Sequence, residues 1–245
     1  MRLTASTSSL GTLALAAFLW SAPAQAQTER PWSFSFDLGG QTAVSGDAHG
    51  GATGSVLGLP TSVTAKTYGD VFGTGFYWAA GIGYHVTPKG EIRVSGSYTS
   101  NPSDELQVGT VAGLQLLAKF DDYKAFGMDF GYRQYLSEGA FKPFVGAGVG
   151  FARVSEINST LSVPAASVTL RDVPFYATST VPTFGFGGGA QMSLTDAVAF
   201  QVGVDFRWSG DLEQSEGLSG TGLQTINDES RRWAVPVTAG LTIRF

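Results

Sequence analysis

The stretch that decides the fold is the last fifteen residues, Arg231 to Phe245, which read RRWAVPVTAGLTIRF. Counting back from Phe245, every second residue as far as Trp233 is apolar, and the residues between them are small or polar. Side chains of a β-strand alternate between its two faces, so this stretch has one apolar and one small or polar face. A barrel strand that crosses a bilayer needs about 9–11 tilted residues, with aromatic residues at both boundaries. The stretch therefore predicts a membrane-crossing strand.

The same period of two recurs in seven further segments. With 33 Gly and 17 Phe, the composition favours strands and turns over helices. The seven expected strands are Trp32–Val44, Gly75–Val86, Glu91–Ser100, Tyr123–Leu136, Pro143–Arg153, Val181–Leu194 and Val198–Ser209.

The connections between the eight segments alternate between long and short. The long ones cover 45–74, 101–122, 154–177 and 210–230, and the short ones cover 87–90, 137–142 and 195–197. Membrane barrels have short periplasmic turns, longer extracellular loops and an even number of strands. We therefore expect an all-β fold, an eight-stranded antiparallel up-and-down transmembrane β-barrel with long extracellular loops and short periplasmic turns. A soluble β-sandwich fits any single segment but does not explain why all the short turns lie at one edge.

The N-terminus has the features of a secretory leader. Arg2 is followed by an apolar run from Leu10 to Trp20 and then by Ala24-Gln25-Ala26. A positive start, a short apolar core and a small-x-small site describe a cleavable signal peptide. The run is too short for a membrane-spanning helix, which needs about 20 residues. We expect residues 1–26 to be a signal peptide and residues 27–245 to form the barrel domain.

Aromatic residues fall near both ends of the expected strands. Amphipathic rings favour the membrane–water interface, so they predict two girdles about one hydrocarbon thickness apart. The girdle residues are Trp32, Trp78, Tyr84, Tyr98, Tyr132, Trp208, Trp233 and Phe245.

With the apolar faces turned to lipid, the opposite faces line a narrow interior that contains charges. A desolvated charge costs several kcal/mol unless it is paired, so we expect each inward Asp to meet an inward Arg, with Arg232 and Arg244 near the two rims. A gate or selectivity ring is the functional alternative, and the narrowness of the barrel favours structural pairing. The expected interior charge network is Asp37, Arg93, Asp129, Arg133, Asp205, Arg207, Arg232 and Arg244.

Glycines dominate the inward faces of three strands, for example Gly81, Gly146 and Gly187. They leave space that either large inward side chains or water must fill. Tyr77 and Phe144 are among the large inward residues, and the sequence leaves the choice open.

Several kinds of chemistry are not expected. The chain has no Cys, which excludes disulfides and thiolate metal sites. It has only two His, with no His–Ser pair at an outer strand end and no metal-ligand cluster. The formal net charge of −5 and the lack of a basic stripe give no support for nucleic-acid binding. We expect no catalytic residues, no metal and no cofactor.

The long connections are the remaining functional surface. Three apolar stretches, Val56–Pro60, Val108–Phe120 and Val163–Tyr176, predict short helices, hairpin extensions or a cap over the barrel mouth. Periodicity around Leu114 to Leu117 does not separate a helix from a strand extension.

Four segments, GFYWAAGIGYHV, FGMDFGYRQYL, PFVGAGVGFARV and AGLTIRF, resemble the small bacterial outer-membrane β-barrel superfamily, which includes OmpA-, OmpX- and OmpW-like proteins and porin-family surface barrels. The resemblance implies an outer-membrane location among membrane lipids. Phe245, with Leu241 and Ile243 before it, resembles the C-terminal assembly signal of such barrels. It implies the barrel-assembly machinery as a partner.

The expected function is a structural or surface role in the envelope without catalysis, with loops available to extracellular ligands. The alternative, implied by resemblance to OmpW, is a narrow porin-type channel for small or apolar solutes. A distant alternative is a lipid A-modifying barrel enzyme. Conductance measurements separate the first two, and analysis of lipid A tests the third.

Overall fold

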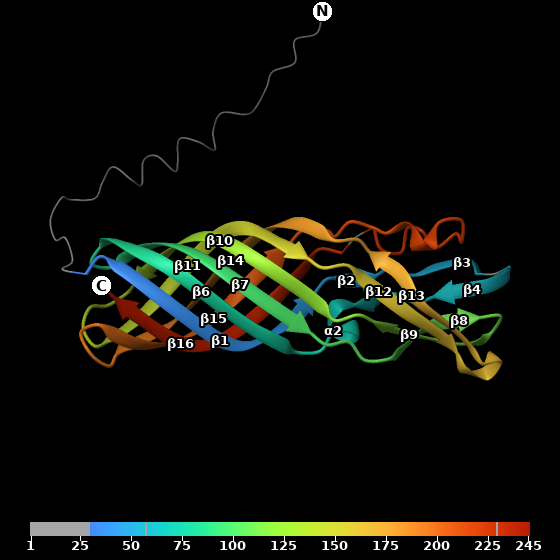
Figure 1. The fold of residues 1–245 in the computed structure, drawn as a ribbon, viewed down its shortest axis with the longest axis horizontal. Helices are drawn as coiled ribbons and strands as arrows, with labels where there is room; N and C mark the ends of the chain where they lie inside the picture. Colours follow the sequence, from blue (N-terminus) through green and yellow to red (C-terminus); the bar gives the residue numbers. More distant parts are fainter. Residues whose placement is uncertain (1–29, 57, 229) are drawn as a thin grey trace, which may run out of the picture.

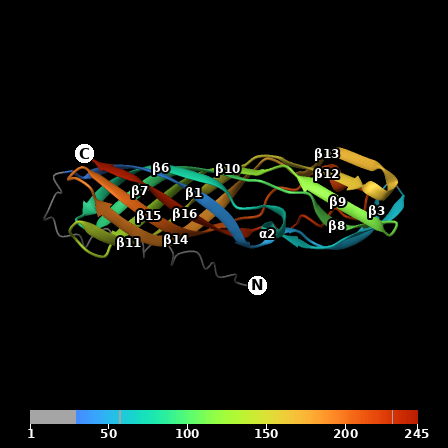
Figure 2. The same ribbon diagram turned by 90° about the horizontal axis from the view of Figure 1, so that it is seen from below.

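A computed structural model describes residues 30–56, 58–228 and 230–245 of the chain. The expected signal peptide, residues 1–26, lies outside these ranges. The described chain forms an elongated molecule with a barrel at one end and a smaller β-rich head at the other (Figures 1 and 2). Among the described residues, no helix has the length and apolarity needed to cross a membrane.

Eight strands close into an antiparallel barrel in the order β1-β16-β15-β14-β11-β10-β7-β6. Each predicted segment became one of these strands, with bounds that differ by at most two residues. The fold prediction is therefore confirmed. The barrel strands are β1 (Trp32–Ser45), β6 (Gly75–Thr87), β7 (Gly90–Asn101), β10 (Tyr123–Tyr135), β11 (Phe141–Val154), β14 (Ser179–Ser193), β15 (Val198–Ser209) and β16 (Arg232–Arg244).

The terminal strand β16 completes the barrel because it pairs with β1 on one side and β15 on the other. At the periplasmic end Phe245 and Trp32 exchange two backbone hydrogen bonds of 3.0 and 3.2 Å. Closure leaves no unpaired strand edge in the barrel wall, which is the condition for β-structure in a bilayer.

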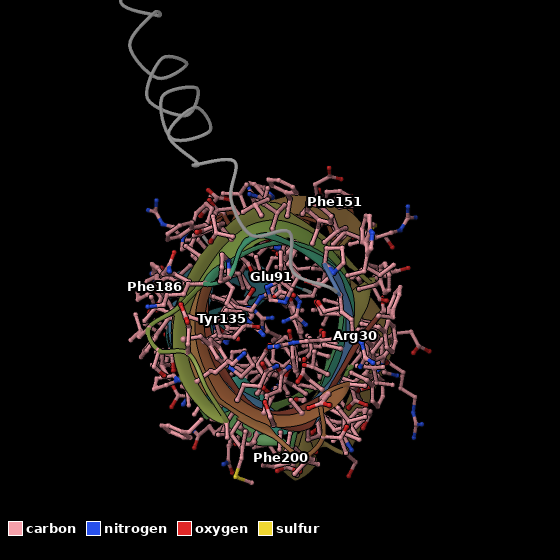
Figure 3. The ribbon with its side chains drawn as sticks, turned by 90° about the vertical axis from the view of Figure 1, so that its left-hand side faces the viewer. Arg30, Glu91, Tyr135, Phe151, Phe186 and Phe200 are labelled. Atoms are coloured by element: carbon pink, nitrogen blue, oxygen red, sulfur yellow. The ribbon has the colours of Figure 1, made fainter. Side chains whose placement is uncertain are left out.

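The outer surface of the barrel is apolar and its inner surface is polar. Figure 3 looks along the barrel and shows Phe151, Phe186 and Phe200 pointing outward, whereas Glu91 and Tyr135 point into the interior. Along β10, for example, Met128 and Phe130 are exposed, and Asp129 between them faces inward. This is the reverse of a soluble protein and suits a wall surrounded by acyl chains.

The prediction that the long connections are loops was only partly right, because most of them continue as β-structure beyond the barrel. A local period of two is weak in these Gly-, Ser- and Thr-rich segments, and their strands are stabilised by pairing with other connections. The additional elements are β2 (Asp47–His49), β3 (Ala52–Val56), β4 (Leu59–Val63), β5 (Lys66–Thr67), α2 (Tyr68–Val71), β8 (Leu106–Val111), β9 (Leu114–Phe120), β12 (Ile157–Val163), η1 (Pro164–Ala166), β13 (Val168–Tyr176) and η2 (Glu216–Leu218).

Three hairpins from three connections form one six-stranded sheet in the order β13-β12-β9-β8-β4-β3. This sheet is the main wall of the head (Figure 1). The hairpin alternative for the three apolar stretches is thus correct, and the segment from Leu114 to Leu117 belongs to β9.

The described part of the fourth connection, residues 210–228 and 230–231, bonds to both edges of this sheet. Ser55 N donates to Thr221 O on the β3 edge (2.7 Å), and Asn227 Nδ2 donates to Phe175 O on the β13 edge (2.6 Å). The sheet and this connection together surround an apolar interior.

Candidate functional site

The barrel interior contains the polar groups predicted from the sequence, arranged in ionic layers along the axis. The layer nearer the head joins β10 and β15. Arg207 Nη2 donates to both oxygens of Asp129, at 2.8 and 2.9 Å, and Arg207 Nη1 donates to the hydroxyl of Tyr77 (3.2 Å). Thr183 Oγ1 donates to Asp129 Oδ1 at 3.2 Å. Such charge-assisted bonds are stronger than neutral ones, so this layer connects four strands, β6, β10, β14 and β15.

A second layer is centred on Asp37 of β1. Arg93 Nη2 lies 3.2 Å from Asp37 Oδ2 and donates to Ser35 Oγ at 2.5 Å. Gln201 Nε2 donates to Asp37 Oδ1 at 2.5 Å. The carboxylate is therefore held from both sides, by a guanidinium on β7 and an amide on β15.

A third layer, closer to the periplasmic turns, is built around Glu91, which the sequence analysis missed. Its carboxylate accepts bonds from Tyr135 Oη (2.9 Å) and from the Ser33 hydroxyl, and Arg133 Nη1 lies 3.9 Å away. Arg133 also donates to Gln201 Oε1 (3.0 Å), which links this layer to the one around Asp37. A signal for Glu91 was present, because it precedes Arg93 by two residues and shares its inward face.

One predicted pairing is wrong. Asp205 faces the interior, yet among the described residues no Arg or Lys nitrogen lies within 4.0 Å of its carboxylate. Arg207 is taken by Asp129, and Arg133 reaches toward Glu91 and Gln201 instead. The alternation of side chains along each strand identifies which residues point inward. The stagger between strands decides which of these inward residues contact each other.

The two remaining arginines occupy the two ends of the barrel. Arg232 lies at the head end, with its guanidinium 3.4 Å from the ring centre of Tyr123 and 5.2 Å from that of Tyr68. Arg244 lies at the periplasmic end and donates to Gln191 Oε1 at 2.7 Å.

Large side chains fill part of the room left by the glycines, and a cavity takes up the rest. Arg133 and Phe144, on the neighbouring strands β10 and β11, stack on each other, with the guanidinium 4.1 Å from the ring centre. A cavity of about 150 Å³ remains beside Gly146 and Gly187. A second cavity of about 30 Å³ lies closer to the head, and Tyr77 and Arg207 line both. The Tyr77–Arg207–Asp129 layer thus stands between two interior spaces.

Six of the eight predicted girdle residues lie on the outer face in neighbouring pairs. Trp32 and Tyr84 contact each other at the turn end, with ring centres 4.9 Å apart. Trp78 on β6 and Tyr98 on β7 are cross-strand partners at the end of the barrel nearer the head. Trp208 is likewise opposite Trp233, while Tyr132 and Phe245 are exposed at the turn end. Leu241 and Ile243 of the expected assembly signal also face outward. That these residues act as girdles or as a signal stays a prediction.

Both histidines pack against aromatic rings. His49 packs in the head against Phe120 and Phe175, with ring centres 6.1 Å from each. His85 stacks on Tyr135 inside the barrel, near the periplasmic turns. No group of three or more metal-ligating side chains occurs in the described part of the chain.

A protein-family model described as the outer membrane protein beta-barrel domain matches residues 12–225. The chain belongs to this family. It is a bacterial outer-membrane β-barrel. A search of curated protein sequences found no significant match.

Several solved outer-membrane barrels are similar to this one. Neisserial surface protein A is 14% identical, with 87% of this chain and 97% of that chain covered and a TM-score of 0.48. OprG of Pseudomonas aeruginosa is 12% identical, with coverage of 90% and 100% and a TM-score of 0.43. The outer membrane protease OmpT of Escherichia coli is 13% identical, with coverage of 92% and 100% and a TM-score of 0.45. Similarity at this level does not indicate what the chain binds or does.

Proposed function

We propose that this barrel has a structural and surface role in the envelope, with a lumen that does not conduct ions and with no catalytic activity. The observation that carries the proposal is the series of bonded polar layers across the lumen. Arg207–Asp129, Arg93–Asp37 and the Glu91–Tyr135–Arg133 group each connect different strands. An eight-stranded barrel has an interior little larger than its side chains, so such layers occupy much of the lumen cross-section.

The layers also account for the inward charges without a transport role. A buried charge is costly when it is unpaired, and pairing within the wall of a narrow barrel removes that cost. The barrel then serves as a rigid anchor, and the head is the part of the protein available to extracellular partners.

Planar-bilayer recording of the purified, refolded protein tests the proposal. We expect no stepwise conductance above that of a protein-free bilayer, with a known porin reconstituted in parallel as a positive control. Reproducible unitary steps that scale with protein concentration would contradict a closed lumen.

A narrow channel is the second candidate, and the two interior cavities favour it. They share Tyr77 and Arg207 as lining residues, so a rearrangement of that one layer would join them. The same recordings decide between the candidates, because a channel requires conductance in the absence of any added ligand.

The absence of catalysis is tested separately. The histidines pack against aromatic rings, at 6.1 Å for His49 and 5.8 Å for His85. We therefore expect mass spectra of lipid A from cells that express the protein to match those from cells with an empty vector. A new lipid A species would favour the enzyme alternative.

A further inference from the structure

The head encloses an apolar cavity of about 160 Å³ that is separate from the barrel lumen. It lies between the six-stranded sheet and residues 218–226 of the fourth connection. Its walls come from all four long connections. The lining includes Val63, Val108, Leu116, Leu161, Phe175 and Leu223.

The cavity offers almost nothing to a polar ligand. Of the described residues that line it, only His49, Thr61 and Ser159 have polar side chains. Each of them already bonds to a backbone carbonyl. Thr61 Oγ1 donates to Leu59 O (3.1 Å), Ser159 Oγ donates to Val173 O (3.3 Å), and His49 Nδ1 lies 3.1 Å from Gly50 O.

Burial lowers the pKa of His49, and Lys66 nearby adds to the effect, which favours the neutral imidazole. A neutral ring placed between Phe120 and Phe175 contributes an aromatic surface to the cavity and no charge.

The end of the cavity toward the barrel is closed by aromatic rings. Phe120 and Phe175 contact each other edge to face with ring centres 5.1 Å apart, and Tyr176 follows 5.0 Å from Phe175. Between this floor and the lumen lie Tyr68 and Tyr123, both fully buried. The cavity therefore ends within the head and does not continue into the barrel.

The other end of the cavity reaches the tips of the hairpins, far from the bilayer. Leu59, Leu114 and Val168 stand at the tips of the β3–β4, β8–β9 and β12–β13 hairpins, and all three line the cavity. Their exposed fractions are 48%, 41% and 43%. Exposed apolar side chains at three converging tips make an entrance that faces the extracellular medium.

We propose that the head binds a small, uncharged, apolar molecule, about the size of one aromatic ring with a short alkyl substituent, taken up from the extracellular medium. A dry cavity of about 150 Å³ lined by Leu, Ile and Phe accommodates benzene, and this cavity has the same size and chemistry. A membrane lipid is a poor occupant, because the entrance lies at the far end of the head. The proposal does not depend on whether the barrel conducts.

Toluene is a suitable probe, measured by ligand-observed NMR on the whole protein in lipid nanodiscs, with empty nanodiscs subtracted to remove partitioning into lipid. We expect saturable binding at one site. Toluene uptake equal to that of empty nanodiscs would overturn the proposal.

Two substitutions on β9 localise the binding. Ala118 is buried and lines the cavity, so Ala118→Met fills it and should weaken toluene binding at least tenfold. Gln115 lies exposed on the same strand and does not line the cavity, so Gln115→Met is the matched control and should bind as the parent does. Equal affinity in the Ala118→Met variant would overturn the assignment of the site.

A third variant covers the case in which Ala118→Met does not fold. Leu116→Ala enlarges the cavity, and we expect it to bind naphthalene more tightly than the parent by at least tenfold. Equal naphthalene binding by the two proteins would contradict the proposal.

Discussion

Replacing Asp129 with Ala is the perturbation whose effect follows most directly from the interior contacts. Asp129 accepts two bonds from Arg207, at 2.8 and 2.9 Å, and the two side chains are only 16% and 17% exposed. The substitution leaves the guanidinium with the hydroxyl of Tyr77 as its remaining bonded partner. Removing one partner of a buried pair costs about 3–5 kcal/mol. Because Arg207 borders the 150 Å³ cavity, which can admit water, we expect the lower end of that range.

The assay is urea unfolding in lipid vesicles, followed by tryptophan fluorescence and extrapolated to zero denaturant. Asp205→Asn is the matched control, since Asp205 lines the same cavity without a basic partner among the described residues. We expect the Asp129→Ala variant to lose about 3 kcal/mol of unfolding free energy and the Asp205→Asn variant to lose none. Equal losses would refute the view that pairing, rather than polarity, determines the contribution of each carboxylate.

Three further outcomes follow from the structure. Gly150→Ala should block barrel assembly, because the added Cβ would collide with the carbonyl oxygen of Met128. Gly185→Ala should assemble, because the atoms nearest to its added Cβ lie 3.4 and 3.5 Å away. Heat-modifiable migration on gels distinguishes an assembled barrel from an unassembled one. Glu91→Gln should lower the urea midpoint, since it weakens the charge-assisted bonds around the carboxylate, and an unchanged midpoint would argue against that layer. The head should lose stability as the pH falls below about 6.5. Burial lowers the pKa of His49, so at lower pH the unfolded segment binds a proton that the folded segment does not bind. We expect faster proteolysis of the head at pH 5 than at pH 7.5, and we expect this difference to disappear in the His49→Phe variant.

The barrel was predictable because its determinants are local. Each strand carries a period of two over ten or more residues, and the lipid enforces it along the whole strand. The terminal strand shows this clearly, since Leu241 and Ile243 face outward and Thr242 is buried between them. The alternation of long and short connections then sets the orientation.

The head and the details of the interior were less predictable, because they depend on contacts between distant segments. The segment from Leu114 to Leu117 has no clear periodicity, and it becomes a strand because β8 pairs with all four of its residues and β12 pairs with Leu117. Likewise, the alternation of side chains along β15 places Asp205 inside the barrel, but the stagger between strands leaves no arginine of the described residues within ion-pair distance. Glu91 was missed because it directly follows the Thr87–Gly90 turn, although it lies two residues from Arg93 and therefore on the same face of the strand.

The most direct test of the central claim, a lumen closed to the outside beneath an accessible head, is single-cysteine labelling on intact cells. The native chain has no Cys, so each replacement is the only thiol in the protein. Ser95 lines the central lumen cavity, and Gln115 is exposed on the head. We predict that a membrane-impermeant maleimide labels the Gln115→Cys protein rapidly and leaves the Ser95→Cys protein unmodified until it is unfolded. Comparable labelling of the two proteins on intact cells would show that the lumen is open.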